Sequence, residues 1–367
     1  METKNKKILF VINKLGVGGA ERVFVNDANS LHDLGYDVRI VTLFGRVEDQ
    51  ALLKDLRLPS NRVHHLNGNG VFDPSVIYGL AKIVRKNKID IVYSTLNEAN
   101  IVSRVVKIFS PQTKVFIREA NIAEPKPFSF KVLDIILNIF ASRIVCVSEE
   151  VRQSLKKYLP MYVSKMAVLM NGVDLPSGQK MYSERTNGVR ILNVGSLNPK
   201  KGQKYLIEAS AILRDRGSNF ELHIYGRGKE QQNLEALIRS LNLDKFVFLH
   251  EPVTYQELSQ KYFDADIFVL SSLWEGCPNV LLEAMAHGTA SVTTLVSGAK
   301  DIVENGKCGM FANVGDAISL AQNIEILIND PELRKKIGIA GKQCICQNYS
   351  VDQHVKRLLL IFEEYGI

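Results

Sequence analysis

The chain has 367 residues, 46% of them hydrophobic and 23% charged, which is ordinary for a globular protein long enough for two domains. No apolar run approaches the roughly 18 residues of a membrane span, and the stretch before Ile8 is too short for a signal peptide, so we expect a cytoplasmic protein. The five cysteines show no metal-ligand spacing, which predicts reduced thiols.

The net charge of +7 is unevenly distributed along the chain. Residues 1–180 carry 26 Lys and Arg against 17 Asp and Glu, whereas residues 181–367 carry 20 against 22. A basic first half predicts an acidic partner, such as an anionic membrane surface, a lipid-linked diphosphate or nucleic acid. Nucleic acid is disfavoured because no known nucleic-acid-binding motif is present. The alternative is a generally solvated basic surface.

The first half alternates apolar strands with helical segments. Ile8–Ile12 has the pattern of a buried strand, and a glycine loop, a helix over about 20–34 and a second strand at 38–43 follow it. This order is a βαβ unit. Further strand-length apolar runs occur at 89–93, 115–117, 144–147 and 168–169. We therefore predict a Rossmann-like, doubly wound α/β domain over residues 1–176.

A polar, turn-rich linker at 177–189 leads into a second series of the same kind. Its predicted strands are 190–194, 221–225, 246–249, 267–270 and 290–293. Residues 190–348 are thus predicted to form a second Rossmann-like domain, and two such domains facing each other would leave a cleft for a ligand at the carboxyl ends of strands. The end of the chain, 349–367, is largely an amphipathic helix, Tyr349–Tyr365, which needs a partner surface.

The most informative stretch is a strand, a loop and a helix between Ile267 and Gly288. Ile267–Leu270 is an unbroken apolar run, and Pro278 fits the first position of the helix that follows. The N–H groups and the positive dipole end of that first turn predict an anion site at the carboxyl end of a strand. His287 ends the helix, where a cation would suit the dipole.

Two glutamates flank this predicted anion site. Glu275 lies in the loop, and Glu283 lies five residues inside the helix, about 7.5 Å below its first turn at the usual helical rise. One carboxylate can therefore reach the head of an extended ligand and the other its middle, with phosphate between them. A nucleoside diphosphate sugar has this layout.

The string E-G-C-P at 275–278, followed by Glu283 and Ala284, resembles the E-x7-E signature of retaining GT-B glycosyltransferases of family 4. The resemblance implies that Glu275 contacts the hydroxyls of the donor sugar and Glu283 those of the ribose. It also implies that the last helix packs back on the first domain. Further donor-binding residues at the mouth of the helix would be Gly276, Cys277, Pro278 and Asn279. A helix cap with a surface glutamate is the alternative.

Three glycine turns after other strands add to the resemblance. Gly18 and Gly19 lie in G-V-G-G-A-E-R, similar to the G-G-x-E-R loop of the family, which lies near the donor phosphate and the acceptor. Gly195 opens a turn before a lysine, and Gly226 lies in a G-x-G turn similar to the one that the family has beside the base. Plain tight turns are the alternative interpretation of the Gly18–Gly19 loop and of the turn at Gly226.

Lys201 lies in G-S-L-N-P-K-K-G, which resembles the G-R-L-x-x-x-K-G string of the family. A lysine there can neutralise the diphosphate as it leaves, a stabilisation that grows along the reaction. We therefore expect Lys201 and Glu275 to be the catalytic residues. Because Ser196 stands where the family usually has arginine, Lys200 or Arg227 could assist Lys201.

Arg118, Glu119 and Asn121 stand where members of the family commonly carry a histidine near the sugar. We expect one of the three to contact the sugar or the acceptor. Asn171 opens an N-G-V-D segment that resembles the domain junction of the family, although Asn-Gly is also a common turn.

Asp264 and Asp266 do not predict a metal site. Two aspartates one residue apart bind a metal–nucleotide complex in glycosyltransferases of the other major fold, but there the pair follows a strand. Here the pair precedes one, so Asp266 is explained as a strand-entry residue. We expect no metal and no cofactor besides the nucleotide-sugar substrate.

The segment Pro127–Phe140 is unusually apolar, and Arg152, Lys156 and Lys157 follow it at helical spacing. Together they could rest on a membrane surface and receive a lipid-linked acceptor. Packing of that helix in the core is the alternative.

The resemblance as a whole implies a retaining glycosyltransferase. It would move a hexose or N-acetylhexosamine from a UDP-sugar to a hydroxyl of an acceptor, a lipid-linked oligosaccharide in bacterial surface polysaccharide synthesis. The protein would be cytoplasmic or peripheral on the inner face of the cell membrane. Two alternatives stay open, a UDP-sugar epimerase of the same fold and a non-catalytic sugar-nucleotide-binding protein.

Overall fold

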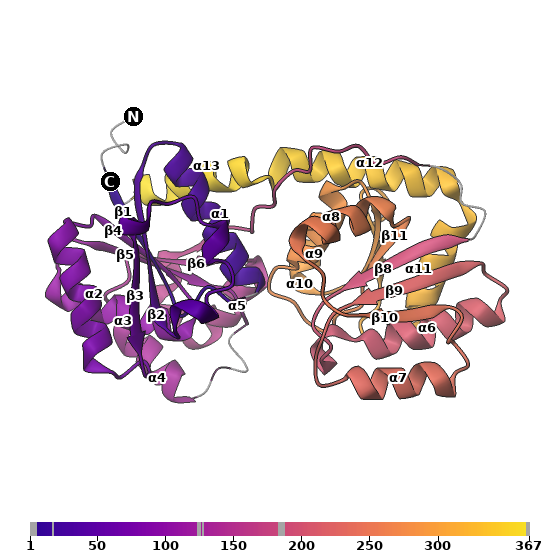
Figure 1. The fold of residues 1–367 in the computed structure, drawn as a ribbon, viewed down its shortest axis with the longest axis horizontal. Coiled ribbons are helices and arrows are strands. Elements are labelled where there is room, and N and C mark those ends of the chain that lie inside the picture. Colours follow the sequence, from indigo (N-terminus) through magenta and orange to yellow (C-terminus); the bar gives the residue numbers. More distant parts are fainter. Residues whose placement is uncertain (1–5, 17, 123–125, 127, 183–187, 365–367) are drawn as a thin grey trace. The chain divides into compact units, whose positions relative to one another are not determined.

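The computed structural model describes residues 6–16, 18–122, 126, 128–182 and 188–364. The chain divides into two compact units, each a parallel sheet covered by helices (Figure 1). Unit 1 comprises Met1–Gly172 and Val351–Ile367, and unit 2 comprises Val173–Ser350. The boundary thus falls inside the N-G-V-D segment, a few residues before position 176.

Seven parallel strands form the sheet of unit 1, in the order β3-β2-β1-β4-β5-β6-β7. The strands are β1 (Lys7–Ile12), β2 (Asp37–Phe44), β3 (Val63–Gly68), β4 (Ile91–Thr95), β5 (Lys114–Glu119), β6 (Arg143–Cys146) and β7 (Met166–Val168). β1 is central because it is apolar on both faces, and Ile8 pairs with Val38 of β2 and with Ile91 of β4. The sequence did not predict β3, an edge strand in which no side chain is fully buried.

The helices of unit 1 lie in sequence between these strands, except for the last. They are α1 (Gly19–Asp33), α2 (Pro74–Asn87), α3 (Asn97–Phe109), α4 (Phe128–Leu137), α5 (Glu149–Tyr158) and α13 (Val351–Glu363). α3 packs against both α2 and α4, and α13 packs against α1. The crossovers therefore build a layer of neighbouring helices on the sheet.

The C-terminal helix α13 is part of the core of unit 1. The ring of Phe362 meets the ring of Phe116 edge-on at 4.8 Å between centroids, and His354 Nε2 lies 3.1 Å from the buried carboxylate of Asp27. The helix begins at Val351 rather than at Tyr349, and Tyr365 lies outside the described residues.

Six parallel strands form the sheet of unit 2, in the order β10-β9-β8-β11-β12-β13. The strands are β8 (Val189–Val194), β9 (Phe220–Tyr225), β10 (Val247–His250), β11 (Ile267–Leu270), β12 (Ala290–Thr294) and β13 (Met310–Ala312). β11 lies between β8 and β12 and is buried along its whole length. Such a strand reads as a continuous apolar run because both of its faces are covered.

The helices of unit 2 are α6 (Gln203–Asp215), α7 (Gln231–Ser240), α8 (Tyr255–Asp264), α9 (Asn279–Ala286), α10 (Ser297–Lys300), α11 (Ala317–Asn329) and α12 (Pro331–Asn348). α9 packs against α12 and on β12, so its apolar side chains from Leu281 onward are buried. The polar stretch before β8 is attached to this unit. Lys180 Nζ donates to the carbonyl of Phe263 at 2.9 Å, and the Tyr182 hydroxyl donates to the carbonyl of Gly288 at 2.9 Å. Within the predicted linker, 183–187 lie outside the described residues.

Candidate functional site

The loop between β11 and α9 is placed as the sequence predicts, at the carboxyl end of a central strand. Pro278 is the N-cap of α9, one residue before the helical position expected for it, which is within the usual uncertainty of a helix end. Its carbonyl accepts hydrogen bonds from the N–H groups of Leu281 and Leu282 at 3.0 and 3.3 Å. Gly276 is buried beside Pro278, and Cys277 and Asn279 are half-buried at the start of the helix.

The carboxylate of Glu275 is held by three side chains, and 5% of the residue is exposed. Oε1 accepts hydrogen bonds from Lys201 Nζ at 2.6 Å and from Ser272 Oγ at 2.7 Å, and Oε2 lies 3.5 Å from Lys200 Nζ. Burial favours the neutral carboxyl, but the charges of the two lysines outweigh it and hold the pKa of Glu275 below its usual value. Glu275 is therefore an anion at neutral pH. Arg227, the other residue expected to be able to assist Lys201, pairs with Glu251 on the surface.

A close contact between two loops brings Lys201 to Glu275. Gly202 has a φ of +61°, and a Cβ at this position would lie 2.1 Å from the carbonyl oxygen of Ser271, so only glycine fits. Ser271 Oγ donates to the carbonyl of Lys201 at 2.9 Å, and the N–H of Leu273 donates to the carbonyl of Lys200 at 2.7 Å. The loops after β8 and β11 are thus joined by one backbone hydrogen bond and by one from the hydroxyl of Ser271.

The glycine turns after β8 and β9 also meet. The N–H of Gly195 donates to the carbonyl of Tyr225 at 3.0 Å, and a Cβ on Gly226 would lie 1.9 Å from the carbonyl oxygen of Gly195. The close approach of the Gly195 carbonyl therefore requires glycine at position 226, whether or not a ligand binds there. Contact of Gly195 and Gly226 with a donor stays a prediction.

Glu283 lies on α9, half-buried, and has a partner different from those of Glu275. Its Oε2 accepts a hydrogen bond from the hydroxyl of Tyr262 on α8 at 2.8 Å. Burial and the neighbouring Glu283 raise the pKa of Tyr262 well above its usual value, so the phenol stays a donor. The β11–α9 segment thus carries two carboxylates, one held by lysines and one by a phenol.

His287 caps the end of α9 as a neutral side chain, although a cation would suit the helix dipole at that position. Its ring contacts the carbonyl of Glu283 and the hydroxyl of Ser259, each at 2.7 Å. Burial lowers the pKa of His287, so the helix dipole does not keep it charged.

The glycine loop of unit 1 leads into the first helix as predicted. Gly18 is the extended N-cap of α1 and Gly19 is its first residue, so the turn follows the carboxyl end of β1. Val17 in the same loop lies outside the described residues. The expected contact of Gly18 and Gly19 with a donor stays a prediction.

Arg118 and Glu119 end β5 inside unit 1, whereas Asn121 is exposed. Arg118 is 1% exposed and donates to Thr95 Oγ1 at 3.2 Å and to Asn171 Oδ1 at 2.5 Å. Asn171, the first residue of the N-G-V-D segment, therefore holds the guanidinium of Arg118 within unit 1. Of the three residues expected near sugar or acceptor, Asn121 is the one that solvent reaches.

A buried ion-pair network that the sequence did not predict adjoins Glu119. Asp134 of α4 accepts hydrogen bonds from Arg104 at 2.8 Å and from Lys126 at 2.7 Å, and Lys126 lies 3.2 Å from Glu119. The hydroxyl of Tyr158 also donates to Asp134, at 3.0 Å. A lone carboxylate inside the apolar string F-S-F-K-V-L-D-I-I-L was the available signal. The network fixes α4 against α3 and the end of β5.

Replacing Asp134 with asparagine should destabilise unit 1 by about 3–5 kcal/mol, because the fully buried guanidinium of Arg104 loses its charged partner. Urea unfolding measures the loss. Asp215, whose carboxylate pairs with Arg214 at the surface, offers the matched control, and Asp215→Asn should change stability by less than about 1 kcal/mol. Equal losses of stability in the two variants would show that the buried network stabilises the fold no more than a surface ion pair does.

The apolar segment expected at a membrane or in the core is largely helix α4, which has one buried face and one exposed face. α4 buries Asp134 and Leu137, but Phe128 is 82% exposed and Ile136 is 59% exposed. Pro127 lies outside the described residues. In the part of the chain that the structure describes, no helix has the length and apolar content needed to cross a membrane.

Each aspartate of the pair before β11 accepts a local hydrogen bond. Asp266 Oδ2 accepts a hydrogen bond from the N–H of Arg190 at 2.8 Å, which joins the starts of β11 and β8. Asp264 is the last residue of α8 and accepts a hydrogen bond from Gln260. Among the described residues, no group of three or more His, Cys, Asp and Glu side chains is placed to hold a metal ion.

Both halves of the chain match known protein families. Residues 17–176 match the family described as Glycosyltransferase Family 4, and residues 179–344 match the family described as Glycosyl transferases group 1. Together the two matches cover most of the chain, with the glycine loop in the first and the E-x7-E string in the second.

Curated relatives match over nearly the whole length of the chain. The GalNAc-alpha-(1->4)-GalNAc-alpha-(1->3)-diNAcBac-PP-undecaprenol alpha-1,4-N-acetyl-D-galactosaminyltransferase of Campylobacter jejuni is 26% identical, over 95% of this chain and 96% of that protein. The UDP-Gal:alpha-D-GlcNAc-diphosphoundecaprenol alpha-1,3-galactosyltransferase of Escherichia coli is 22% identical, over 93% and 92%.

Solved structures share the fold. HepE of Anabaena, crystallised in complex with UDP, superposes with a TM-score of 0.83 at 20% identity, over 98% of this chain and 100% of that one. The lipopolysaccharide outer core galactosyltransferase WaaB superposes with a TM-score of 0.78 at 18% identity, over 98% and 99%. The two Rossmann-like units therefore make up a GT-B fold.

Proposed function

The chain belongs to the family 4, group 1 glycosyltransferases, and from this premise we propose that it transfers a hexose or N-acetylhexosamine from a UDP-sugar, with retention of anomeric configuration, to a lipid-linked oligosaccharide. UDP as the nucleotide is supported by the UDP complex of HepE. An acceptor on a lipid diphosphate is supported by the names of the Campylobacter and Escherichia relatives. We place the reaction in bacterial surface polysaccharide synthesis.

The observation that carries the proposal is the ion pair between Lys201 and Glu275 at the N-terminal end of α9. A lysine ammonium has three donors, so Lys201 can keep Glu275 and still donate to a diphosphate. The N–H groups of α9 favour the same anion. Glu275, kept ionised by the lysines, can accept hydrogen bonds from the hydroxyls of the sugar.

In the proposed reaction the bond between the anomeric carbon and the β-phosphate oxygen breaks, and that oxygen keeps the electron pair. The acceptor hydroxyl adds to the same face of the sugar, and its proton passes to the leaving diphosphate. Lys201 and the start of α9 stabilise the charge that develops on the diphosphate. We assign no metal and no protein nucleophile to this step.

A panel of UDP-, GDP-, ADP- and dTDP-sugars tests the proposal, with release of the free nucleoside diphosphate as the readout. We expect slow hydrolysis of one UDP-sugar, faster turnover with a lipid-linked acceptor, and an α-linked product from an α-linked donor. Binding of a donor without any release would instead indicate a sugar-nucleotide-binding protein. Interconversion of UDP-sugars without release of UDP would indicate an epimerase.

Replacing Glu283 with alanine should weaken UDP binding about 10- to 100-fold and change kcat little, because charged hydrogen bonds to the ribose are lost. Titration calorimetry with UDP measures the change. Tyr262→Phe is the matched variant, since it removes the phenol that contacts Glu283 and leaves the carboxylate in place. We expect a smaller loss of affinity for it. Unchanged UDP affinity in the Glu283 variant would remove Glu283 from the donor site.

A further inference from the structure

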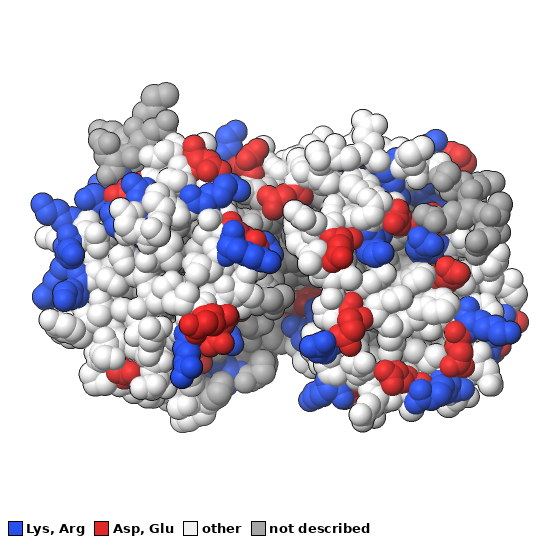
Figure 2. Space-filling model, in the orientation of Figure 1, with Lys and Arg blue, Asp and Glu red and all other residues white. Residues whose placement is uncertain are grey.

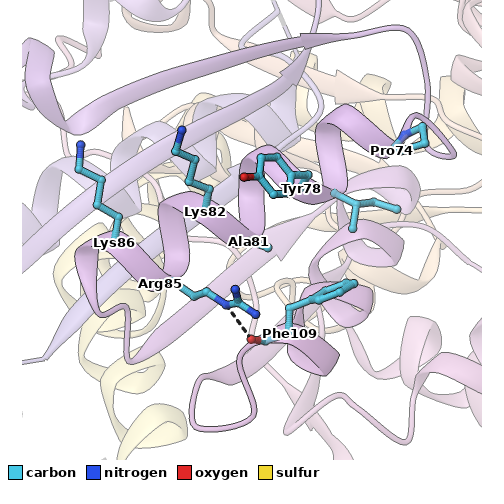
Figure 3. A pocket seen from close by; sticks show the side chains of 8 residues that line it. Pro74, Tyr78, Ala81, Lys82, Arg85, Lys86 and Phe109 are labelled. Atoms are coloured by element: carbon cyan, nitrogen blue, oxygen red, sulfur yellow. Dashed lines mark hydrogen bonds between the residues drawn. The ribbon is translucent and has the colours of Figure 1, made fainter.

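Unit 1 carries a groove along α2, and unit 2 carries a pair of thiols, both outside the candidate site. The groove is lined by Tyr78, Arg85 and Phe109 among others, and Arg85 Nε donates to the carbonyl of Phe109 at 3.0 Å (Figure 3). Figure 2 shows Lys and Arg side chains gathered at the edge of unit 1 where Figure 1 has α2. None of the described residues that line the groove carries a thiol, carboxylate or imidazole. The thiols of unit 2 are the groups with chemistry that the candidate site does not use.

Cys308 lies in a tight turn that leads into β13. The N–H of Cys308 donates to the carbonyl of Glu304 at 3.1 Å, and the N–H of Gly306 donates to the carbonyl of Gly309 at 2.8 Å. The sulfur of Cys308 accepts a hydrogen bond from the N–H of Glu304, with 3.1 Å between nitrogen and sulfur. The turn therefore closes around Cys308 and directs a backbone donor at its sulfur.

Helix α12 places Cys344 against this turn. A Cβ at Gly341 would lie 3.3 Å from the carbonyl oxygen of Cys308, so a small residue at position 341 lets the turn approach the helix. Cys344 follows Gly341 by three residues and shares its face, and helical Cβ atoms tilt towards the N-terminus, so its side chain leans towards Cys308. Cys344 Sγ donates to the carbonyl of Ile302 at 3.6 Å, and Cys308 Sγ lies 3.9 Å from the same oxygen. The two thiols also share a hydrogen bond.

This contact makes one of the two groups a thiolate and leaves the other a thiol. The hydrogen bond from Cys344, aided by the N–H of Glu304, lowers the pKa of Cys308 to about 6 although the site is partly buried. The same hydrogen bond, together with burial, raises the pKa of Cys344 above its usual value. Cys308 is therefore mainly a thiolate at pH 7, and the thiolate is the reactive form of cysteine. Cys344 is half-buried, so a small neutral oxidant reaches the pair from solvent.

We propose that Cys308 and Cys344 are a peroxide-sensitive pair, in which Cys308 is oxidised first and Cys344 then closes an intramolecular disulfide. The inference goes beyond the proposed function and does not depend on it, because it uses none of the residues assigned to the donor. A dithiol is favoured over a set of metal ligands because, among the described residues, no group of three or more His, Cys, Asp and Glu is placed to hold a metal ion.

The oxidation balances in two steps, with hydrogen peroxide as the oxidant. The Cys308 thiolate attacks one oxygen of the peroxide, the O–O bond breaks, and hydroxide leaves while Cys308 becomes a sulfenic acid. The sulfur of Cys344 then attacks the sulfur of Cys308, the S–S bond forms and the S–O bond breaks. The sulfenic oxygen leaves as water with the proton of Cys344. The two sulfurs lose two electrons in all, and the peroxide gains them.

The disulfide would join the turn before β13 to the last turns of α12. The two cysteines are 36 positions apart, from 308 to 344, and the segment between them holds β13, α11 and most of α12. A cross-link over a loop of this length restricts the unfolded chain. The midpoint of thermal unfolding of unit 2 should therefore rise by about 5–10 °C on oxidation.

Peptide mapping of the full chain after treatment with hydrogen peroxide tests the pairing. Trypsin leaves Cys344 and Cys346 on one peptide, 343–356, so the mapping uses the Cys346→Ser variant. We expect a peptide that links Cys308 to Cys344, the raised thermal midpoint, and reversal of both by dithiothreitol. Absence of this linked peptide, or a link from either thiol to Cys146 or Cys277, would overturn the proposal.

Serine variants assign the two roles. Cys344→Ser should form no disulfide, and its Cys308 should be labelled after peroxide by dimedone, which traps sulfenic acids. In Cys308→Ser, dimedone should label Cys344 at least about tenfold more slowly, because a cysteine with its usual pKa is only a few per cent thiolate at pH 7. Cys346→Ser, two residues from Cys344 on the same helix, is the matched control and should keep the rise in thermal midpoint. A rise that persists in Cys344→Ser, or equal labelling of Cys308 and Cys344, would contradict the assignment.

Discussion

Replacing Lys201 with alanine is expected to lower kcat by about 100- to 1,000-fold, the usual effect of removing one preorganised donor from developing charge. In the proposed reaction Lys201 stabilises the diphosphate as it leaves, so its contribution is larger in the transition state than in the ground state. Steady-state release of UDP, with the donor in excess, measures the change. The Michaelis constant for the donor should change much less.

Lys200→Ala is the matched control, because Lys200 is the neighbouring residue and lies farther from the same carboxylate, 3.5 Å against 2.6 Å. Its kcat should fall by no more than about tenfold, because Lys200 is partly exposed and solvent screens its charge. Both variants should be compared with wild type by urea unfolding, since each removes a partner of Glu275. A Lys201 variant with the kcat of wild type would remove this residue from the reaction.

Replacing Glu275 with glutamine is expected to lower kcat by at least about 100-fold, because the amide cannot accept from the sugar hydroxyls and hold both lysines as the carboxylate does. It should also destabilise unit 2 by about 1–3 kcal/mol, since Lys200 and Lys201 lose the anion between them. UDP release and urea unfolding at pH 7 measure the two effects.

The stability difference between wild type and the Glu275→Gln variant should depend on pH in a definite direction. The pKa of Glu275 is lowered in the folded protein, so its carboxylate stabilises the fold above the unfolded pKa of about 4.3. That stabilisation is lost as the pH falls through the folded pKa. A difference that persists undiminished at pH 3 would show that the charge of Glu275 is not its source.

Much of the fold could be predicted because its strands are buried on both faces. Ile267–Leu270 is a strand with the bounds that its apolar run indicated. The two strands that were missed lie at sheet edges: β3, whose string V-H-H-L-N-G lacks a continuous apolar run, and β13, which is only three residues long. Helix ends were predicted to within a few residues, as Pro278 and Val351 show.

The partners of the candidate site residues were harder to predict than the residues themselves. Lys201 and Glu275 are 74 positions apart, and each was assigned to a ligand without reference to the other. Their contact depends on the backbone approach at Gly202, which no local pattern encodes. Arg104 and Asp134 likewise meet across 30 positions, through the packing of α4 on α3. The neutral state of His287 depends on its burial, which cannot be read from its position at a helix end.

A crystal structure of the protein with UDP bound tests the central claim most directly, namely that the β11–α9 segment binds the donor. The account predicts the ribose hydroxyls within hydrogen-bonding distance of Glu283 and the diphosphate at Lys201 and the first N–H groups of α9. UDP bound elsewhere, with Glu283 contacting only Tyr262 and Lys201 only Glu275, would contradict it.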